Sequence, residues 1–299
     1  MTFKMTIAMR TRGRIDKQLT MKRFCLERIM SNKKLKSWID LHIVVPDTEQ
    51  EDYLQEYPWT KPYLHTIPES YKSGSIFQSL LKIENRYVFC IDDDLQLDRR
   101  RDPLSPSQAG ASGTYEDACD CLYRVREYFE RGYVHGGISL RPYNFGVVGE
   151  FSSEVGRVCR AMFWDGLIIR KEKIRFDAVQ SRSDFHMWLS LIELGYPNII
   201  DYEFMVGENG AGKGDKGGTN TPGGCSRYRT PEFQLAQAEL LKKLHPETCS
   251  IIFKQKVSPS AMKMSVPGKG IPDVRIQWAK ALGIKSHLRK AKAIGKVVV

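Results

Sequence analysis

Three consecutive aspartates follow an apolar run in the segment from Tyr87 to Leu95. Side chains two residues apart in a strand point to the same face, so Asp92 and Asp94 are placed to share one cation. Three carboxylates this close repel one another unless a cation or hydrogen-bond donors lie among them. Mg²⁺ or Mn²⁺, completed by water and substrate phosphate, is the usual partner of such a pair. The spacing therefore predicts a metal site and a phosphate-bearing substrate.

A turn is the alternative explanation for the aspartates, because aspartate is common after strands and bonds neighbouring backbone groups. A turn rarely uses three such residues. The uninterrupted apolar run from Tyr87 to Ile91 also indicates a buried strand that ends at the triplet. We therefore favour the metal site.

Asp184 is the second candidate for chemistry, because it begins a segment with helical spacing. Its apolar stripe is made by Phe185, Trp188, Leu189 and Ile192, and Gly195 ends it. An aspartate in a first turn is an ordinary capping residue. The same carboxylate within reach of a substrate hydroxyl acts as a general base. Spacing alone leaves both roles open.

Three other segments have residue types that meet ligands. Thr11 and Arg12 follow an expected strand, where arginine offers a planar donor fork to phosphate. Residues 207–229 are rich in glycine and form either a diphosphate contact or a linker; their basic side chains include Lys213, Arg227 and Arg229. His135 is followed by two glycines, Gly136 and Gly137. This pair either lets a ligand approach the backbone or turns the chain.

The elements that must position these residues alternate between strand and helix. We expect strands at residues 5–9, 41–45 and 87–91, and helices at 17–30, 76–81 and 115–131. Alternation of this kind predicts a parallel sheet that binds ligands at the carboxyl ends of its strands. Residues 98–114 have almost no apolar content, so we expect a mobile loop there, either a lid or a disordered insert.

Charge is distributed unevenly along the 299 residues, which carry a net charge of +11. Residues 251–299 contain eleven basic residues and one acidic residue, so this segment alone accounts for +10. A basic segment of this kind favours a polyanion, whose counterions are released on binding. A solvated helix, or a contact with ribosomes or an acidic lipid surface, is the alternative. We expect DNA contacts from the cluster Lys280, Lys285, Arg289, Lys290 and Lys292.

Cysteine usage and hydropathy indicate the cellular compartment of the protein. The seven cysteines are scattered, odd in number and include no Cys-x-x-Cys pair, which disfavours a zinc site or a disulfide framework. No apolar stretch is long enough to span a membrane. We expect a soluble, cytoplasmic protein with no membrane partner.

Together, these segments resemble the GT-A class of nucleotide-sugar glycosyltransferases. Within that class, their order is similar to the phage and trypanosomatid branch associated with thymine- and methylcytosine-hydroxylating dioxygenases, which glycosylates 5-hydroxymethylpyrimidines in DNA. The resemblance covers roughly residues 5–230 and rests on four pieces: residues 83–95, residues 135–139, residues 181–196 and residues 217–229. One departure is Ser183-Asp184, where many members have Glu-Asp.

The resemblance implies a role for each segment. The aspartates become the DxD motif, with Asp92 and Asp94 as metal ligands, and Asp184 becomes the catalytic base. The nucleotide-sugar donor, expected to be a UDP-sugar with Mn²⁺ or Mg²⁺, would be contacted by Thr11, Arg12, Asp92, Asp93, Lys213, Arg227 and Arg229. His135, Gly136 and Gly137 would face the acceptor. Many members use a late histidine as a further metal ligand, and His245 is the candidate here.

The predicted fold is therefore α/β, with a Rossmann-like, mixed but mostly parallel sheet flanked by helices and a basic C-terminal extension. We expect a catalytic domain at residues 1–235 and the extension at 236–299. The predicted activity is metal-dependent, inverting transfer to 5-hydroxymethylated pyrimidines in double-stranded DNA. Saccharide, lipid-linked or protein acceptors remain alternatives, as do a nucleotidyltransferase and a non-catalytic DNA-binding protein.

Overall fold

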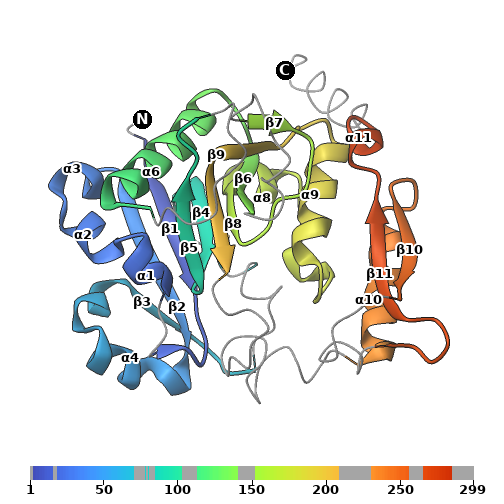
Figure 1. The fold of residues 1–299 in the computed structure, drawn as a ribbon, viewed down its shortest axis with the longest axis horizontal. Helices are drawn as coiled ribbons and strands as arrows, with labels where there is room; N and C mark the ends of the chain where they lie inside the picture. The colour runs from blue at the N-terminus through green and yellow to red at the C-terminus, as the bar shows by residue number, and fades with distance from the viewer. Residues whose placement is uncertain are drawn as a thin grey trace, which may run out of the picture.

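A single large sheet forms the centre of this computed structural model. The structure describes residues 3–15, 19–70, 78, 80, 85–102, 113–140, 152–208, 230–255 and 265–284. Within these ranges the sheet order is β3-β2-β1-β4-β8-β6-β9-β5, and β7 pairs with β9 (Figure 1). The strands are β1 (Met5–Arg10), β2 (Ile39–Pro46), β3 (Leu64–Ile67), β4 (Tyr87–Asp92), β5 (Leu95–Arg99), β6 (His135–Leu140), β7 (Ser152–Glu154), β8 (Ala161–Asp165) and β9 (Ile199–Glu208).

Most strands of the sheet run in one direction. The pairings β3–β2, β2–β1 and β1–β4 are parallel, and so is β6–β9. β8 runs antiparallel to both β4 and β6, and β5 and β7 run antiparallel to β9. The carboxyl ends of β1 and β4 therefore lie at the same sheet edge as the start of β8. This arrangement confirms the predicted mixed, mostly parallel sheet.

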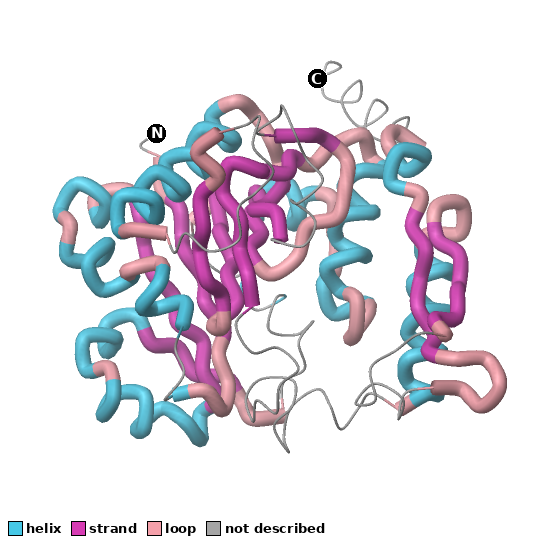
Figure 2. The backbone as a smooth tube through the Cα atoms, in the orientation of Figure 1, coloured by secondary structure: helices cyan, strands magenta, loops and turns pink. Residues whose placement is uncertain are grey.

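Helices cover both faces of the sheet, and strand alternation explains why. Along β4, Phe89 and Ile91 enter one apolar cluster while Val88 and Cys90 enter the other. The first cluster packs under α1, α2, α3, α4 and α6, and the second under α8, α9, α10 and α11 (Figure 2). These helices are α1 (Leu19–Arg23), α2 (Leu26–Ser31), α3 (Lys33–Lys36), α4 (Gln50–Glu56), α6 (Tyr115–Glu130), α8 (Gly166–Lys171), α9 (Ser183–Glu193), α10 (Pro231–Leu244) and α11 (Trp278–Ala281).

Several predicted elements differ from the observed ones. The helix expected at residues 17–30 is broken at Cys25, whose φ of 49° is left-handed, so two short helices replace it. β3 lies outside the predicted strands, and β5 runs to Arg99 and so contains the first two residues of the expected loop at 98–114. Residues 103–112 lie outside the described residues, as does most of the helix expected at 76–81.

The C-terminal part of the chain is more structured than the predicted basic extension. α10 spans the predicted boundary at residue 235, and β10 (Cys249–Lys254) pairs antiparallel with β11 (Ile271–Ile276). Leu241 of α10 and Val274 of β11 are buried in the same cluster as α9. Residues 285–299 lie outside the described residues. Among the described helices, none is long and apolar enough to cross a membrane.

Candidate active site

The aspartate triplet lies at the carboxyl end of β4, as predicted. Asp92 is the parallel neighbour of Arg10 in β1, and Arg10 Nε donates to Asp92 Oδ1 at 3.1 Å. The Asp92 N–H donates to the carbonyl of Arg160, just before β8, at 3.0 Å, and the Arg160 guanidinium lies 3.9 Å from Asp92 Oδ2. The two arginines therefore flank one carboxylate at the edge where three strands meet.

Thr20 fixes the backbone of the turn that holds the triplet. Its hydroxyl donates to the Asp92 carbonyl at 2.6 Å and accepts from the Leu95 N–H at 2.8 Å. Its own N–H donates to the Asp93 carbonyl at 3.1 Å. Because Thr20 is fully buried at the start of α1, this helix positions the aspartates.

Arg14 joins the other two aspartates. Its Nη1 lies 2.7 Å from Asp93 Oδ1 and 2.9 Å from Asp94 Oδ2, and all three residues are buried. Burial raises the pKa of Asp93 to about 6, although Arg14 and Thr11 act to lower it. Asp93 Oδ2 and Asp94 Oδ1 are buried without a hydrogen-bond partner within the described part of the chain. A buried acceptor without a donor is costly, so these oxygens indicate a missing ligand.

The donor set at the triplet fits a hard divalent cation. In the described ranges, no group of three or more His, Cys, Asp or Glu residues could hold a metal by itself. Mg²⁺ and Mn²⁺ do not require such a group, since one or two carboxylates with water and substrate phosphate suffice. The unpartnered oxygens of Asp93 and Asp94 meet that requirement, while Asp92 is engaged by Arg10 and Arg160.

Asp184 lies in the first turn of α9, and the segment before β8 links that turn to Asp92, since the Arg157 guanidinium lies 5.1 Å from the Phe185 ring and the Arg160 carbonyl accepts the Asp92 N–H. Burial raises the pKa of Cys159 in this segment, and the charges of Asp184 and Asp92 raise it further. Burial raises the pKa of Asp184 itself, and the Phe185 N–H, Arg157 and Arg10 oppose that effect. Two acids about ninety positions apart in the chain thus share one charged environment.

The predicted nucleotide contacts are only partly described. The Thr11 hydroxyl is 2.6 Å from the Tyr53 hydroxyl, and both side chains are buried. Arg12 forms an ion pair with Glu69, whereas its neighbours Arg10 and Arg14 pair with the aspartates. Lys213, Arg227 and Arg229 lie outside the described residues, although the segment that carries them follows Glu208, the register partner of Leu95.

His135, Gly136 and Gly137 lie inside the sheet in β6. His135 is fully buried, is stacked on Trp188 and donates from Nε2 to the Tyr196 carbonyl at 2.7 Å. Burial lowers its pKa to about 3, so the ring is neutral. A Cβ on Gly137 would overlap Val158 and the Ala161 carbonyl, and one on Gly136 would overlap the Ile199 carbonyl. Packing within the sheet explains both glycines, and the acceptor role stays a prediction.

His245, the late histidine, lies in different surroundings from the aspartates, and Lys280 is the residue of the predicted basic cluster that the structure describes. His245 is 1% exposed and contacts His186 and Glu193, which places it in a buried polar cluster of α9 and α10. Lys280 lies in α11. The other predicted DNA contacts, Lys285, Arg289, Lys290 and Lys292, lie outside the described residues.

Sequence reasoning missed the arginines that surround the acids. Arg10 and Arg14 flank Arg12, the predicted nucleotide contact, and Arg157 and Arg160 precede β8. Aligning β1 with β4 in parallel register would have placed Arg10 beside Asp92. Arg160 has a left-handed φ of 72°, which an arginine rarely adopts and which no sequence pattern indicates.

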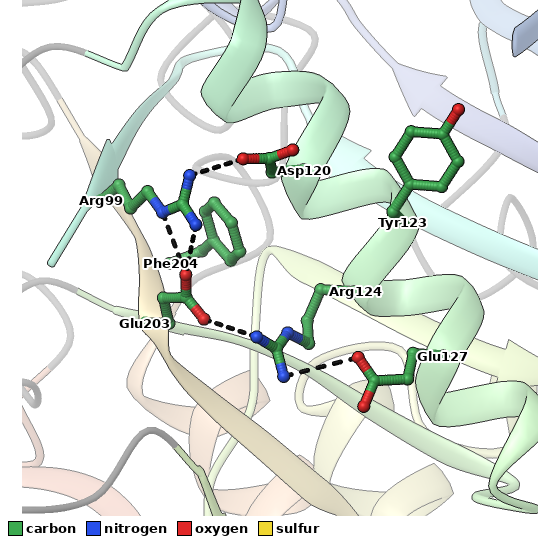
Figure 3. A pocket seen from close by; sticks show the side chains of 7 residues that line it. All are labelled: Arg99, Asp120, Tyr123, Arg124, Glu127, Glu203 and Phe204. Carbon is green, nitrogen blue, oxygen red and sulfur yellow. Dashed lines mark hydrogen bonds and ion pairs between the residues drawn. The ribbon is translucent and has the colours of Figure 1, made fainter. Parts of the chain in front are cut away.

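A polar hollow lies among α6, β5 and β9 (Figure 3). Glu203 lies 2.6 Å from Arg99 and 2.7 Å from Arg124, and Arg99 also lies 2.6 Å from Asp120. Charges of both signs balance within this network. We interpret it as a set of ion pairs that holds α6 to the two strands.

Comparison with known proteins gives two sequence relatives. They are the proteins named beta-glucosyl-HMC-alpha-glucosyl-transferase of Enterobacteria phage T6 and of Enterobacteria phage T2, each 23% identical over 214 residues. The match covers 69% of this chain and 72% of each relative. No protein-family model matches the chain.

Two solved structures have a low structural similarity to the chain. The 4-diphosphocytidyl-2C-methyl-D-erythritolsynthase from Anaerococcus prevotii has a TM-score of 0.35 and 10% identity, over 62% of this chain and 81% of that protein. A197 from STIV has a TM-score of 0.34 and 11% identity, over 68% and 84%. Similarity at this level carries no functional argument. The sequence relatives, both named glucosyltransferases, support the predicted enzyme class, a glycosyltransferase.

Proposed function

We propose that this enzyme moves a sugar from a nucleotide-sugar donor, expected to be a UDP-sugar, to a hydroxyl on a hydroxymethylated pyrimidine of DNA. The observation that carries the proposal is the aspartate triplet at the carboxyl end of β4, which the segment before β8 joins to the start of α9: the Asp92 N–H donates to the Arg160 carbonyl, and the Arg157 guanidinium lies over the Phe185 ring. Asp92 belongs to a triplet with unpartnered buried oxygens among the described residues, and Asp184 begins a helix at the same edge. A diphosphate site and a proton acceptor are the two parts that sugar transfer requires.

In this mechanism Asp184 takes the proton of the acceptor hydroxyl as that oxygen attacks the anomeric carbon. The new carbon–oxygen bond forms while the bond from the anomeric carbon to the diphosphate oxygen breaks, and the electron pair leaves with the diphosphate. A single displacement of this kind inverts the anomeric configuration. Burial raises the pKa of Asp184, which makes its carboxylate a better base than an exposed aspartate.

Cationic side chains near the triplet would stabilise the departing diphosphate. Arg10 and Arg160 flank Asp92, and Arg14 joins Asp93 to Asp94. Their planar donor groups match phosphate oxygens geometrically. A divalent cation held by Asp94, with Asp92 or Asp93 beside it, would supply Lewis-acid neutralisation of the charge that develops on the leaving group.

Two acceptors are consistent with the relatives. Their names join glucosyl transfer to HMC, the abbreviation of hydroxymethylcytosine, and also to a glucosyl group already attached to it. The first acceptor is thus the hydroxymethyl group itself, and the second is a hydroxyl of a sugar that the base already carries. Both lie on the major-groove edge of a cytosine.

The test is a mass measurement on DNA. Wild-type protein is incubated with Mn²⁺ and a panel of nucleotide sugars on three otherwise identical duplexes, with cytosine, hydroxymethylcytosine or glucosyl-hydroxymethylcytosine. We expect the mass of one sugar to be added to one of the modified duplexes only, with release of the nucleoside diphosphate. Addition of a nucleotide with release of pyrophosphate would instead show a nucleotidyltransferase. Transfer only to a saccharide, lipid or protein would refute the DNA acceptor.

Asp184→Asn is the matched variant for this assay. Asparagine preserves the shape of the side chain and its hydrogen-bonding capacity at the helix start but cannot accept a proton. We expect donor binding near the wild-type affinity and transfer reduced about a hundredfold or more, as general-base catalysis contributes that much. Nearly normal transfer with a lowered melting temperature would reduce Asp184 to a helix-capping residue.

A further inference from the structure

The C-terminal module, defined here as the described residues between 230 and 284, lies against α9 (Figure 1). Hydrogen bonds join it to the last turn of the helix and to His186. His245, at the end of α10, donates from Nδ1 to Glu193 at 3.0 Å and shares a 2.9 Å hydrogen bond with His186. The Gly283 N–H donates to the Ile192 carbonyl at 3.1 Å. The helix that carries Asp184 is therefore held along its length by a later part of the chain.

The start of α9 is held by Arg182, the residue before the helix. Its Nη2 donates to the Pro272 carbonyl at 3.0 Å and lies 3.5 Å from Asp273 Oδ1 in β11. The Arg182 side chain is 11% exposed, and Asp273 also forms an ion pair with Lys254. The strand pair β10–β11 is thus tied to a position two residues before Asp184.

The backbone of Arg182 is unusual for its residue type. Its φ is 71° and its ψ is 28°, a left-handed conformation that glycine adopts readily and arginine does not. The Arg182 carbonyl accepts the His186 N–H at 3.1 Å, while its side chain does not cap the helix. An arginine at a position suited to glycine indicates that its side chain has a use that offsets the backbone strain.

We propose that Arg182, anchored on β11 through Pro272 and Asp273, is a positioning residue that sets the direction of the Asp184 carboxylate. The C-terminal module is then part of the catalytic apparatus, in addition to any contact it makes with DNA. This inference rests on the proposed role of Asp184 as the base. A small displacement of a catalytic group lowers the rate strongly, because the reacting atoms must be aligned.

Arg182→Gly separates positioning from stability. Glycine suits the left-handed backbone and removes the anchor, so we expect the melting temperature to stay within a few degrees of wild type. We expect kcat for transfer to fall by about tenfold to a hundredfold, with the donor KM within about twofold. Arg182→Lys, which keeps a donor and a charge, should recover part of kcat. Asp273→Asn, which leaves the bond to the Pro272 carbonyl, should lower kcat less than the glycine variant, and the double variant should be no worse than Arg182→Gly.

Asp177→Asn is the control, because Asp177 forms an ion pair of the same chemistry with Arg175, 2.6 Å away, before the start of α9. Its kcat should stay at the wild-type value. An unchanged kcat in Arg182→Gly, or an equal reduction in Arg182→Lys, would overturn the inference. If the wild-type enzyme transfers no sugar to any DNA, the proposed acceptor is refuted, but the positioning role of Arg182 is not. Positioning is then measured by hydrolysis of the donor, in which Asp184 activates water, and an unchanged hydrolysis rate in Arg182→Gly overturns it.

Discussion

At the scale of single residues, an arginine and a bound cation would share the carboxylate oxygens of the site. Arg14 holds one oxygen each of Asp93 and Asp94, and the other oxygen of each is buried without a partner in the described residues. A bound cation would satisfy those two acceptors and reduce the repulsion between the acids. Removing one of the carboxylates should therefore remove the cation.

Asp94→Asn should abolish metal-dependent transfer and leave the fold intact, because Arg14 keeps its ion pair with Asp93. Loss of the Lewis acid should lower the rate by about a hundredfold or more. Transfer rate against Mn²⁺ concentration, with Mn²⁺ binding followed by calorimetry in the presence of the nucleoside diphosphate, measures both effects. Asp52→Asn on α4, an exposed carboxylate, is the control. Wild-type turnover by Asp94→Asn, or full activity of the wild-type enzyme in the presence of a chelator, would refute the proposed role of the metal.

Arg157→Gln should move the acid limb of the pH–kcat profile to higher pH. Burial raises the pKa of Asp184, and the positive charge of Arg157 is one of the effects that oppose it. The base must be deprotonated, so activity is lost as pH falls through this pKa. Without the charge the pKa of Asp184 rises further. Arg157→Lys should keep the wild-type limb. A limb that stays in place or moves to lower pH in the glutamine variant would contradict the assignment of Asp184.

At the scale of elements, local sequence patterns predicted individual strands and helices. They missed the contacts between residues of different segments. The strand before Asp92 and the amphipathic helix after Asp184 were correct because each has a strong local period. Arg160 and Arg182 were missed because their roles depend on left-handed backbone and on partners far along the chain. The break at Cys25 was missed for the same reason, since the helical period continues across it.

Asp201 in β9 provides a test of how α6 is held on the sheet. Its Oδ2 accepts from the Tyr128 hydroxyl at 2.6 Å, and its Oδ1 accepts from the Phe204 N–H at 2.7 Å. Burial raises the pKa of Asp201 to about 6 in the folded protein. The folded state therefore binds more protons than the unfolded state between about pH 4 and pH 6, so this residue's contribution to stability falls as pH rises through that window.

Asp201→Asn removes that titration and keeps both partners within hydrogen-bonding reach. Relative to the variant, wild type should lose about 3 kcal/mol of unfolding free energy between about pH 4 and pH 6.5. Denaturant unfolding of both proteins at several pH values measures the difference. A difference that is constant with pH, or that grows in favour of wild type as pH rises, would show that Asp201 is ionised throughout.

At the scale of the whole molecule, the basic charge and the acids of the candidate site lie in different parts of the chain. Residues 251–299 carry nearly all of the net charge, while the acids of the site lie in the first two hundred residues. The described part of the basic segment is not a simple tail, since β10 and β11 pack beside α9 and Lys254 is paired with Asp273. Composition identified the charge, but it gave no information about the strands, whose pairing bridges a separation of many residues.

Neutralising Arg289, Lys290 and Lys292 with glutamine should weaken transfer to modified duplex DNA in a salt-dependent way. Each phosphate that is no longer neutralised makes the slope of log affinity against log salt shallower by about 0.9, so the slope should change by about 3 in total. Donor hydrolysis should not change. The control replaces the exposed lysines of α3, Lys33, Lys34 and Lys36, which should leave the slope unaltered. Equal slopes of log affinity against log salt for both triple variants would show that DNA does not bind at residues 289–292.

The reversed direction of β8 has a consequence for variation at the site. Because this strand runs against β4 and β6, it begins at the edge where those two strands end, so the residues just before it lie beside the aspartates. Arg157 and Arg160 belong to that segment, while Arg10, Arg14 and the aspartates come from the parallel half. Substitutions at these two arginines should therefore affect both candidate acids from a segment that contains neither, since Arg160 contacts Asp92 and the charge of Arg157 opposes the rise that burial causes in the pKa of Asp184.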